Sequence, residues 1–218
     1  LARWEVLYAG VNRANAVISL INNSDSPSDF GVELAQAYFL RGHFNFELKK
    51  IYENVPFISQ ENYDAQEFSQ PNSGATAVSW AVIESDFSYA KDNLPASRGG
   101  NYVEAGRPLA ATAQAFLGKA QLYQSKWSDA LGNLDAVISS GKFSLAADFM
   151  SNWNSSGENG SEAMFAIQYS ADDAQSKQGN ATGALNHPGG GPFGSCCGFY
   201  QPTQDLLDAY QTSSGLPV

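Results

Sequence analysis

The stretch "GKAQLYQSKWSDALGNLDAVISSGKFSL", Gly118 to Leu145, decides the fold class. It has the pattern of two helices joined by a tight turn, with Gly141 ending the second helix. Gly118, Ala120 and Ala130 carry little side-chain bulk, so the two helix axes can approach to roughly 8–10 Å. The outer faces of such a pair must be buried by neighbouring helices. We therefore predict that further helices pack on both sides of this pair.

Hydrophobic periodicity extends this architecture along the chain. Apolar residues spaced three and four apart predict helices over 3–22, 32–52 and 76–93, a fourth beginning near Pro108 and a fifth from Trp127. Residues 57–75 are expected to be irregular, and 163–170 are predicted to form one strand. Thr203 is the expected N-cap of a last helix. The sequence thus predicts a helical scaffold, 1–170, and within the same domain a ligand-binding region, 171–218, with a long irregular glycine-rich loop.

Composition and charge exclude several kinds of partner. The chain has 12 basic and 22 acidic residues, a net charge of −10. Nucleic acid and anionic lipid both need basic surfaces, so neither is expected as a partner. No cofactor or metal is expected, because His43 and His187 lie far apart and the two cysteines are adjacent, which does not match the spacing of zinc ligands. A neutral glycan or a protein partner fits this composition better.

Catalysis is the least favoured function. The pairs Asp172–Asp173 and Asp205–Asp208 could be considered as the two carboxylates of a glycoside hydrolase. Asp205 and Asp208 lie three residues apart on a predicted helix, where charged side chains usually face solvent. No catalytic residues are therefore predicted. The sequence alone leaves capture of a glycan as the first hypothesis, and a helical-repeat scaffold that binds peptide or protein partners as the alternative.

The helix pair is similar to the tetratricopeptide repeat. Gly118 and Ala130 stand twelve residues apart and are followed by Leu134 and Val137, as in that repeat. Gln121 stands where the repeat has Tyr, so the match is partial. We therefore expect tetratricopeptide-like helix pairs.

The order of the segments extends the resemblance to a family. The segments, in this order, are "WEVLYAGVNRAN" (4–15), "ELAQAYFLRGHFNFELKKIYENVPF" (33–57), "AVIESDFSYAKDNLP" (81–95), residues 106–145, "GSEAMFAIQYS" (160–170) and "PTQDLLDAY" (202–210). Over nearly the whole chain they resemble the SusD/RagB-like nutrient-binding lipoproteins of the starch-utilization type. By the same comparison, the chain is expected to be an internal fragment without the family's lipid-anchored N-terminal stretch and much of its C-terminal half.

The resemblance implies an all-α fold with tetratricopeptide-like helix pairs, and also a function and a location. It implies a non-enzymatic surface lipoprotein of a Gram-negative outer membrane, held there only through a lipid anchor outside this fragment. It implies capture of an oligosaccharide or glycan for a TonB-dependent (SusC-like) outer-membrane transporter.

Candidate ligand-binding residues follow from the chemistry of sugars. A pyranose stacks its C–H face on an aromatic ring, while polar side chains bond its hydroxyls. Such groups are found on loops held by a rigid scaffold. The resemblance points to the loop region before the "PTQDLL" helix and to an aromatic on the first helix. The candidates are Trp4, Asn186, His187, Phe193, Cys196, Cys197, Phe199 and Tyr200.

Several of these residues have an alternative role. Trp4 also lies on the apolar stripe of its helix, and Phe199 and Tyr200 could pin the loop to the core. Trp80 and Trp127 are expected in the core. The adjacent cysteines form either a vicinal disulfide, which would offer a sugar an apolar platform, or two free or intermolecularly paired thiols. Their Cα atoms are 3.8 Å apart across a trans peptide, short of the usual disulfide separation, although a bridge can persist outside the cytoplasm.

Overall fold

The computed structural model describes residues 2–168, 203–209, 212–213 and 216–217. The chain divides into two compact units, Leu1–Ile167 and Gln168–Val218.

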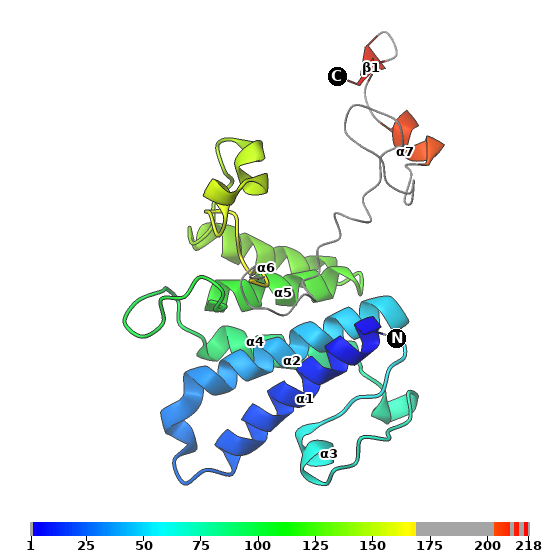
Figure 1. Ribbon diagram of the computed structural model, residues 1–218, viewed down its shortest axis with the longest axis vertical. Coiled ribbons are helices and arrows are strands. Elements are labelled where there is room, and N and C mark those ends of the chain that lie inside the picture. Colours follow the sequence, from blue (N-terminus) through cyan, green and yellow to red (C-terminus); the bar gives the residue numbers. More distant parts are fainter. Residues whose placement is uncertain (1, 169–202, 210–211, 214–215, 218) are drawn as a thin grey trace. The chain divides into compact units, whose positions relative to one another are not determined.

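Five long helices build the first unit. They are α1 (Ala2–Asn22), α2 (Gly31–Tyr52), α4 (Trp80–Asn93), α5 (Ala110–Leu122) and α6 (Trp127–Ser139). The main contacts run from α1 to α2, from α2 to α4, from α4 to α5 and from α5 to α6 (Figure 1). Each helix is thus covered by its neighbours in the stack, as in a helical-repeat protein. The prediction of an all-α fold with tetratricopeptide-like pairs is confirmed.

Shorter helices fill the connections. They are η1 (Pro27–Phe30), α3 (Gln60–Asp64), η2 (Gly74–Thr76), η3 (Phe149–Trp153) and η4 (Ser155–Gly157). The prediction that 57–75 is irregular is wrong at α3. There the Ser59 side chain accepts a hydrogen bond from the Asn62 backbone N–H, and the Asn62 side chain accepts one from the Ser59 N–H. This reciprocal cap stabilises a single helical turn.

One predicted boundary moves, and one predicted strand does not form over its described residues. The third long helix begins at Trp80 rather than near residue 76, because the Ser79 hydroxyl accepts a hydrogen bond from the Val82 N–H and caps it there. Residues 163–168 form no strand, so the strand prediction is wrong over that part. Phe165 in this segment packs instead against Phe39 and Phe116 at the core.

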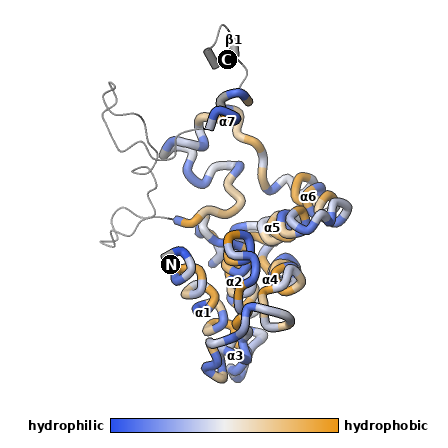
Figure 2. Tube along the Cα trace, turned by 90° about the vertical axis from the view of Figure 1, so that its right-hand side faces the viewer, coloured by the Kyte–Doolittle hydropathy of each residue, from blue (hydrophilic) through white to orange (hydrophobic). Residues whose placement is uncertain are grey.

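The core is rich in aromatic side chains. Phe39, Phe46 and Phe87 are each at most 1% exposed, and Phe39 and Phe87 have ring centroids 5.7 Å apart. Hydrophobic and hydrophilic stretches alternate along α1, α2 and α4 (Figure 2). Because α2 contacts both α1 and α4, it is buried on two sides, as its wide apolar arc predicts.

The close crossing of α5 and α6 is confirmed. A Cβ atom built on Gly118 would lie 3.0 Å from Leu134 Cγ and 3.4 Å from the carbonyl oxygen of Ala130. Ala130 itself is fully buried. Gln121, which replaces the Tyr of the repeat, accepts a hydrogen bond of 2.9 Å from Asn133 of α6. A polar contact thus joins the two helices where the repeat has an aromatic ring.

The prediction that Trp127 lies in the core is wrong. Trp127 is 64% exposed, and Leu131 and Ile138 of the same helix are 61% and 74% exposed. The reason is that α6 is the last helix of the stack in the described part of the chain and packs only on α5. Trp80 does pack at the edge of the core, as expected, with its ring 5.9 Å from those of Phe46 and Tyr123.

The described part of the second unit contains α7 (Gln204–Asp208) and a two-residue hairpin of β1 (Thr212–Ser213) and β2 (Leu216–Pro217). The Thr203 hydroxyl accepts a hydrogen bond from the Leu206 N–H, which confirms the predicted N-cap. Asp205 and Asp208 are exposed, as expected. Among the described helices, none has both the length and the apolar character required to span a membrane.

Candidate functional site

An aromatic pocket of about 210 Å³ lies beside α1. We use this name for the cavity bounded by the rings of three aromatic residues, one amide side chain and a short extended segment. Its lining residues are Trp4, Tyr8, Asn12, Pro56, Ile58 and Phe68.

The helix places three of these groups in a row. Trp4, Tyr8 and Asn12 are each four residues apart, so they lie one turn above another on the same face of α1. The Trp4 and Tyr8 rings are 4.7 Å apart at 48°, and the ring of Tyr52, from the end of α2, meets Trp4 edge-on at 5.1 Å. These contacts restrict the orientation of the indole. Trp4 therefore packs at the rim of the core and also lines the pocket.

The opposite wall is the extended segment 55–58, which is anchored by side chains of α1. The Tyr8 hydroxyl donates to the Pro56 carbonyl at 2.7 Å, and the Asn15 amide donates to the Ile58 carbonyl at 2.8 Å. Burial raises the pKa of Tyr8 well above its ordinary value, so the phenol stays protonated and keeps donating. The wall is thus fixed in place before any ligand arrives.

A buried ion pair holds the Asn15 side chain that anchors this wall. Arg41 of α2 binds Asp86 of α4 with two hydrogen bonds of 2.9 and 2.7 Å, and Asp86 is only 2% exposed. A third guanidinium nitrogen of Arg41 donates to Asn15 Oδ1 at 3.1 Å. Since Asn15 holds Ile58, the network connects three helices to the pocket wall. The Asn15 side chain is fully buried, so its role is to position the wall.

The pocket offers stacking faces, and one of its lining residues, Asn12, carries an unused acceptor. Asn12 Oδ1 is buried, and no described residue donates a hydrogen bond to it. A buried acceptor without a donor costs about 1–3 kcal/mol, so a hydroxyl that reached it would be favoured. Among the lining residues that the structure describes, none has a charged side chain. This combination suits a ligand with an apolar face and neutral hydroxyl groups.

Trp4 is the one sequence-predicted site residue that the structure describes. Asn186, His187, Phe193, Cys196, Cys197, Phe199 and Tyr200 lie outside the described residues. The sequence reasoning did not assign Tyr8, Asn12 or Phe68 to a site. The four-residue spacing in "WEVLYAGVN" would have found the first two, whereas Phe68 reaches the pocket only through the fold of the 59–76 connection.

The remaining candidates for catalysis or metal binding are His43 and clusters of His, Cys, Asp or Glu side chains. His43 packs against the rings of Phe44 and Phe116, and burial lowers its pKa. Within the described residues, no three His, Cys, Asp or Glu side chains gather closely enough to hold a metal ion.

Fold and pocket together define a class: an all-α protein of stacked tetratricopeptide-like helix pairs, with an aromatic-lined cavity on its first helix. A family model described as "Starch-binding associating with outer membrane" matches residues 1–122, more than half of the chain. The chain therefore belongs to this SusD-like family.

Individual relatives agree with this assignment. The SusD-like protein P2 of Formosa agariphila is 29% identical over 175 residues, covering 77% of this chain and 34% of the relative. A solved SusD homologue from Bacteroides thetaiotaomicron is 28% identical, with a TM-score of 0.57 over 69% of this chain and 31% of the homologue. The chain thus spans about a third of the length of these relatives.

A further solved structure shares the fold alone. Surface glycan-binding protein A from Bacteroides thetaiotaomicron, in complex with laminarihexaose, is 21% identical. Its TM-score is 0.60, over 77% of this chain and 35% of that protein.

Proposed function

We propose that the protein binds a mostly neutral oligosaccharide, and that the aromatic pocket is part of its binding site. The observation that carries this proposal is the convergence of three aromatic residues, Trp4, Tyr8 and Phe68, and the amide residue Asn12 around one cavity. Phe68 is 43% exposed, so a sugar can reach its ring. Membership in a family described as starch-binding supports this ligand class.

Each group has a distinct part in binding. The aromatic rings offer apolar faces to the C–H face of a pyranose, and Asn12 Oδ1 accepts a hydrogen bond from a hydroxyl. The ring contacts of Trp4 and the hydrogen bonds that hold segment 55–58 restrict the site before binding, which lowers the entropic cost of association. The loop residues Asn186, His187, Phe193, Cys196, Cys197, Phe199 and Tyr200 are proposed as further ligand contacts, with Tyr200 foremost.

The wider role follows from the family. We propose that the whole protein is lipid-anchored at the surface of the outer membrane and captures glycan for a TonB-dependent, SusC-like transporter. It releases the glycan unchanged. The family's description as associating with the outer membrane supports this location.

A glycan array followed by calorimetry tests the proposal. We expect saturable binding of at least one neutral oligosaccharide and no change in its length after prolonged incubation. Absence of binding across neutral glycans would contradict glycan capture. Shortened products would contradict the non-enzymatic role.

One observation favours the alternative, a scaffold that binds a peptide or protein. The exposed face of α6 carries Trp127, Leu131 and Ile138, which are 61–74% exposed, and large contiguous apolar surfaces often mark protein contacts. Under this alternative, substitutions on α6 would weaken partner binding, and the array would show no glycan binding.

A further inference from the structure

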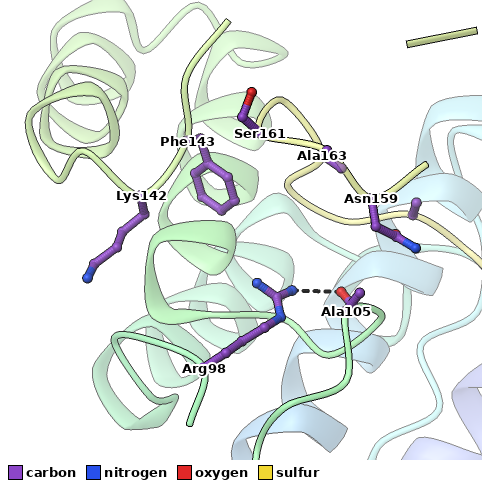
Figure 3. Close-up of a pocket in the computed structure, with 9 residues that line it drawn as sticks. Arg98, Ala105, Lys142, Phe143, Asn159, Ser161 and Ala163 are labelled. Atoms are coloured by element: carbon purple, nitrogen blue, oxygen red, sulfur yellow. Dashed lines mark hydrogen bonds between the residues drawn. The ribbon is translucent and has the colours of Figure 1, made fainter. Parts of the chain in front are cut away.

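A second cavity, of about 160 Å³, has a different chemical character from the aromatic pocket. It lies between the turn that contains Arg98 and Ala105 and the later segment that contains Phe143 and Ser161 (Figure 3). Arg98 and Lys142 both line it, and none of its described lining residues is acidic. We call it the basic pocket.

Arg98 is held by backbone carbonyl groups. Its Nε donates to the Glu104 carbonyl at 3.3 Å, and its Nη2 donates to the carbonyls of Ala105 and Arg107 at 2.6 and 3.1 Å. Among the described residues, none accepts a hydrogen bond from Nη1. In Figure 3 the dashed line joins the guanidinium group of Arg98 to Ala105, on the side of the cavity formed by the turn. The backbone carbonyls thus fix the Arg98 guanidinium group and leave Nη1, which carries two protons, available to donate.

Lys142 adds a second positive charge at the rim. Its Nζ donates to the hydroxyl of Ser97 at 2.6 Å, and Ser97 is the neighbour of Arg98 in the chain. Within the described part of the chain, neither cation has a carboxylate within 4.0 Å, whereas nearby Arg107 pairs with Glu104 at 3.0 Å. The two charges therefore lie beside the same turn without a carboxylate partner.

The neighbouring carboxylates are engaged elsewhere. Glu104 is occupied by Arg107, and Glu162 accepts a hydrogen bond from Asn152. Two cations and no acidic residue among the described lining residues are unexpected in a chain whose net charge is −10. Such a pocket favours a negatively charged ligand group, because a charge-assisted hydrogen bond is roughly twice as strong as a neutral one.

We propose that the basic pocket binds a single oxyanion group, a carboxylate or a sulfate. Arg98 Nη1 donates hydrogen bonds to it, and Lys142 strengthens the positive potential at the rim. The volume holds about five water molecules at roughly 30 Å³ each, which suits one charged substituent with its hydration rather than a whole sugar ring. The assignment of this group to an acidic sugar rests on the proposed function. Binding of a free inorganic anion does not depend on that function.

Calorimetric titration at low ionic strength tests this site, because salt screens exposed charges. The probes are sodium sulfate and sodium glucuronate, with glucose as the neutral comparison. The variants are Arg98→Gln and Lys142→Gln. The control is Arg13→Gln, which removes the same charge from an exposed position on α1 outside the basic pocket.

We expect saturable binding of sulfate, glucuronate or both, and none of glucose. Arg98→Gln should weaken binding about tenfold or more, since hydrogen bonds to charged groups contribute about 1.5–3 kcal/mol. Lys142→Gln should weaken anion binding about twofold to fivefold. This variant keeps the Arg98 carbonyl contacts, so it still tests the site if Arg98→Gln does not fold. Arg13→Gln should bind as the unmodified protein does.

Two results would overturn the proposal. One is no saturable binding of either anion, and the other is an equal loss in Lys142→Gln and Arg13→Gln, which would indicate net charge rather than a site. Binding of sulfate but not glucuronate would identify an inorganic or sulfated ligand, and the reverse would identify a uronate. Trp4→Ala should leave anion binding unchanged, so failure of this site and failure of the aromatic pocket are distinguishable.

Discussion

Replacing Asp86 with Ala should destabilise the first unit strongly. Asp86 is 2% exposed and Arg41 is 8% exposed, and two hydrogen bonds join them. Removing the carboxylate leaves a buried guanidinium group whose remaining side-chain hydrogen-bond partner is the neutral amide of Asn15. The rings of Tyr38 and Phe57, over which the guanidinium lies, carry no negative charge to replace the carboxylate. The variant therefore retains the cost of desolvating a charge and loses the attraction that offset it.

The expected size of the effect follows from this burial. Breaking a buried ion pair by removing one partner costs about 3–5 kcal/mol. That is a large share of the roughly 5–15 kcal/mol that stabilises a typical domain. For a unit of this length, about 2–4 °C per kcal/mol converts the loss to a Tm lower by roughly 6–20 °C. Because Asn15 also holds Ile58, Asp86→Ala should loosen the wall of the aromatic pocket as well.

Chemical denaturation monitored by circular dichroism measures this loss. The double variant Arg41→Met/Asp86→Leu is the matched control, because replacing both partners with apolar side chains is often neutral or stabilising. A loss below about 1 kcal/mol in Asp86→Ala would refute the reasoning, because it would mean that water hydrates the unpaired Arg41 guanidinium group. A double variant as unstable as the single one would show that packing, rather than an unpaired charge, is responsible.

Three further predictions concern other parts of the chain. Ala130→Phe should overpack the α5–α6 crossing and cost about 1–3 kcal/mol, and an unchanged Tm would show that the helices do not approach closely there. Burial alone would raise the pKa of Glu84, but hydrogen bonds from Lys126 and two glutamines outweigh it and hold the pKa below its ordinary value. The protein should therefore be more stable than Glu84→Gln at neutral pH and should lose that advantage as the pH falls through the lowered pKa. A Tm difference that stays constant with pH would contradict this. If the adjacent cysteines form part of the binding surface, Cys196→Ser/Cys197→Ser should weaken glycan binding in calorimetry while circular dichroism stays unchanged, and unaltered affinity would remove them from the site.

The helices were predictable because their patterns are local. The spacing of apolar residues and the breakers Pro56 and Pro95 locate α1, α2 and α4 to within a few residues. The small residues Gly118 and Ala130 correctly predict a close crossing, because steric bulk alone decides how near two helices can come.

The errors came from tertiary context. Trp127 starts a helix with an apolar stripe, and such a stripe normally predicts burial. The sequence does not show that, within the first unit, α5 is the one long helix that packs on α6. The apolar run "AMFAI" was interpreted as a strand, although a short run of this kind has no decisive periodicity. In the structure, Phe165 packs against helices instead.

The candidate site was only partly predictable for the same reason. Trp4 was identified from the sequence, but its relation to Phe68 and Pro56 depends on a connection that returns to α1. Asn15 lies on the buried face of α1, but its partners Arg41 and Ile58 lie 26 and 43 residues away along the chain. Hydrogen bonds at such separations leave no local pattern in the sequence.

The aromatic pocket is tested most directly by calorimetry with a bound glycan on Trp4→Ala and on Trp127→Ala. Both variants lose one indole, but only Trp4 lines the pocket, whereas Trp127 lies exposed on α6. Loss of a buried aromatic contact costs about 1–3 kcal/mol, so Trp4→Ala should bind about tenfold to a hundredfold more weakly, while Trp127→Ala should bind as the unmodified protein does. Folded Trp4→Ala that keeps full affinity would contradict the account, and a matching loss in Tyr200→Ala would then place the binding site in the loop before α7.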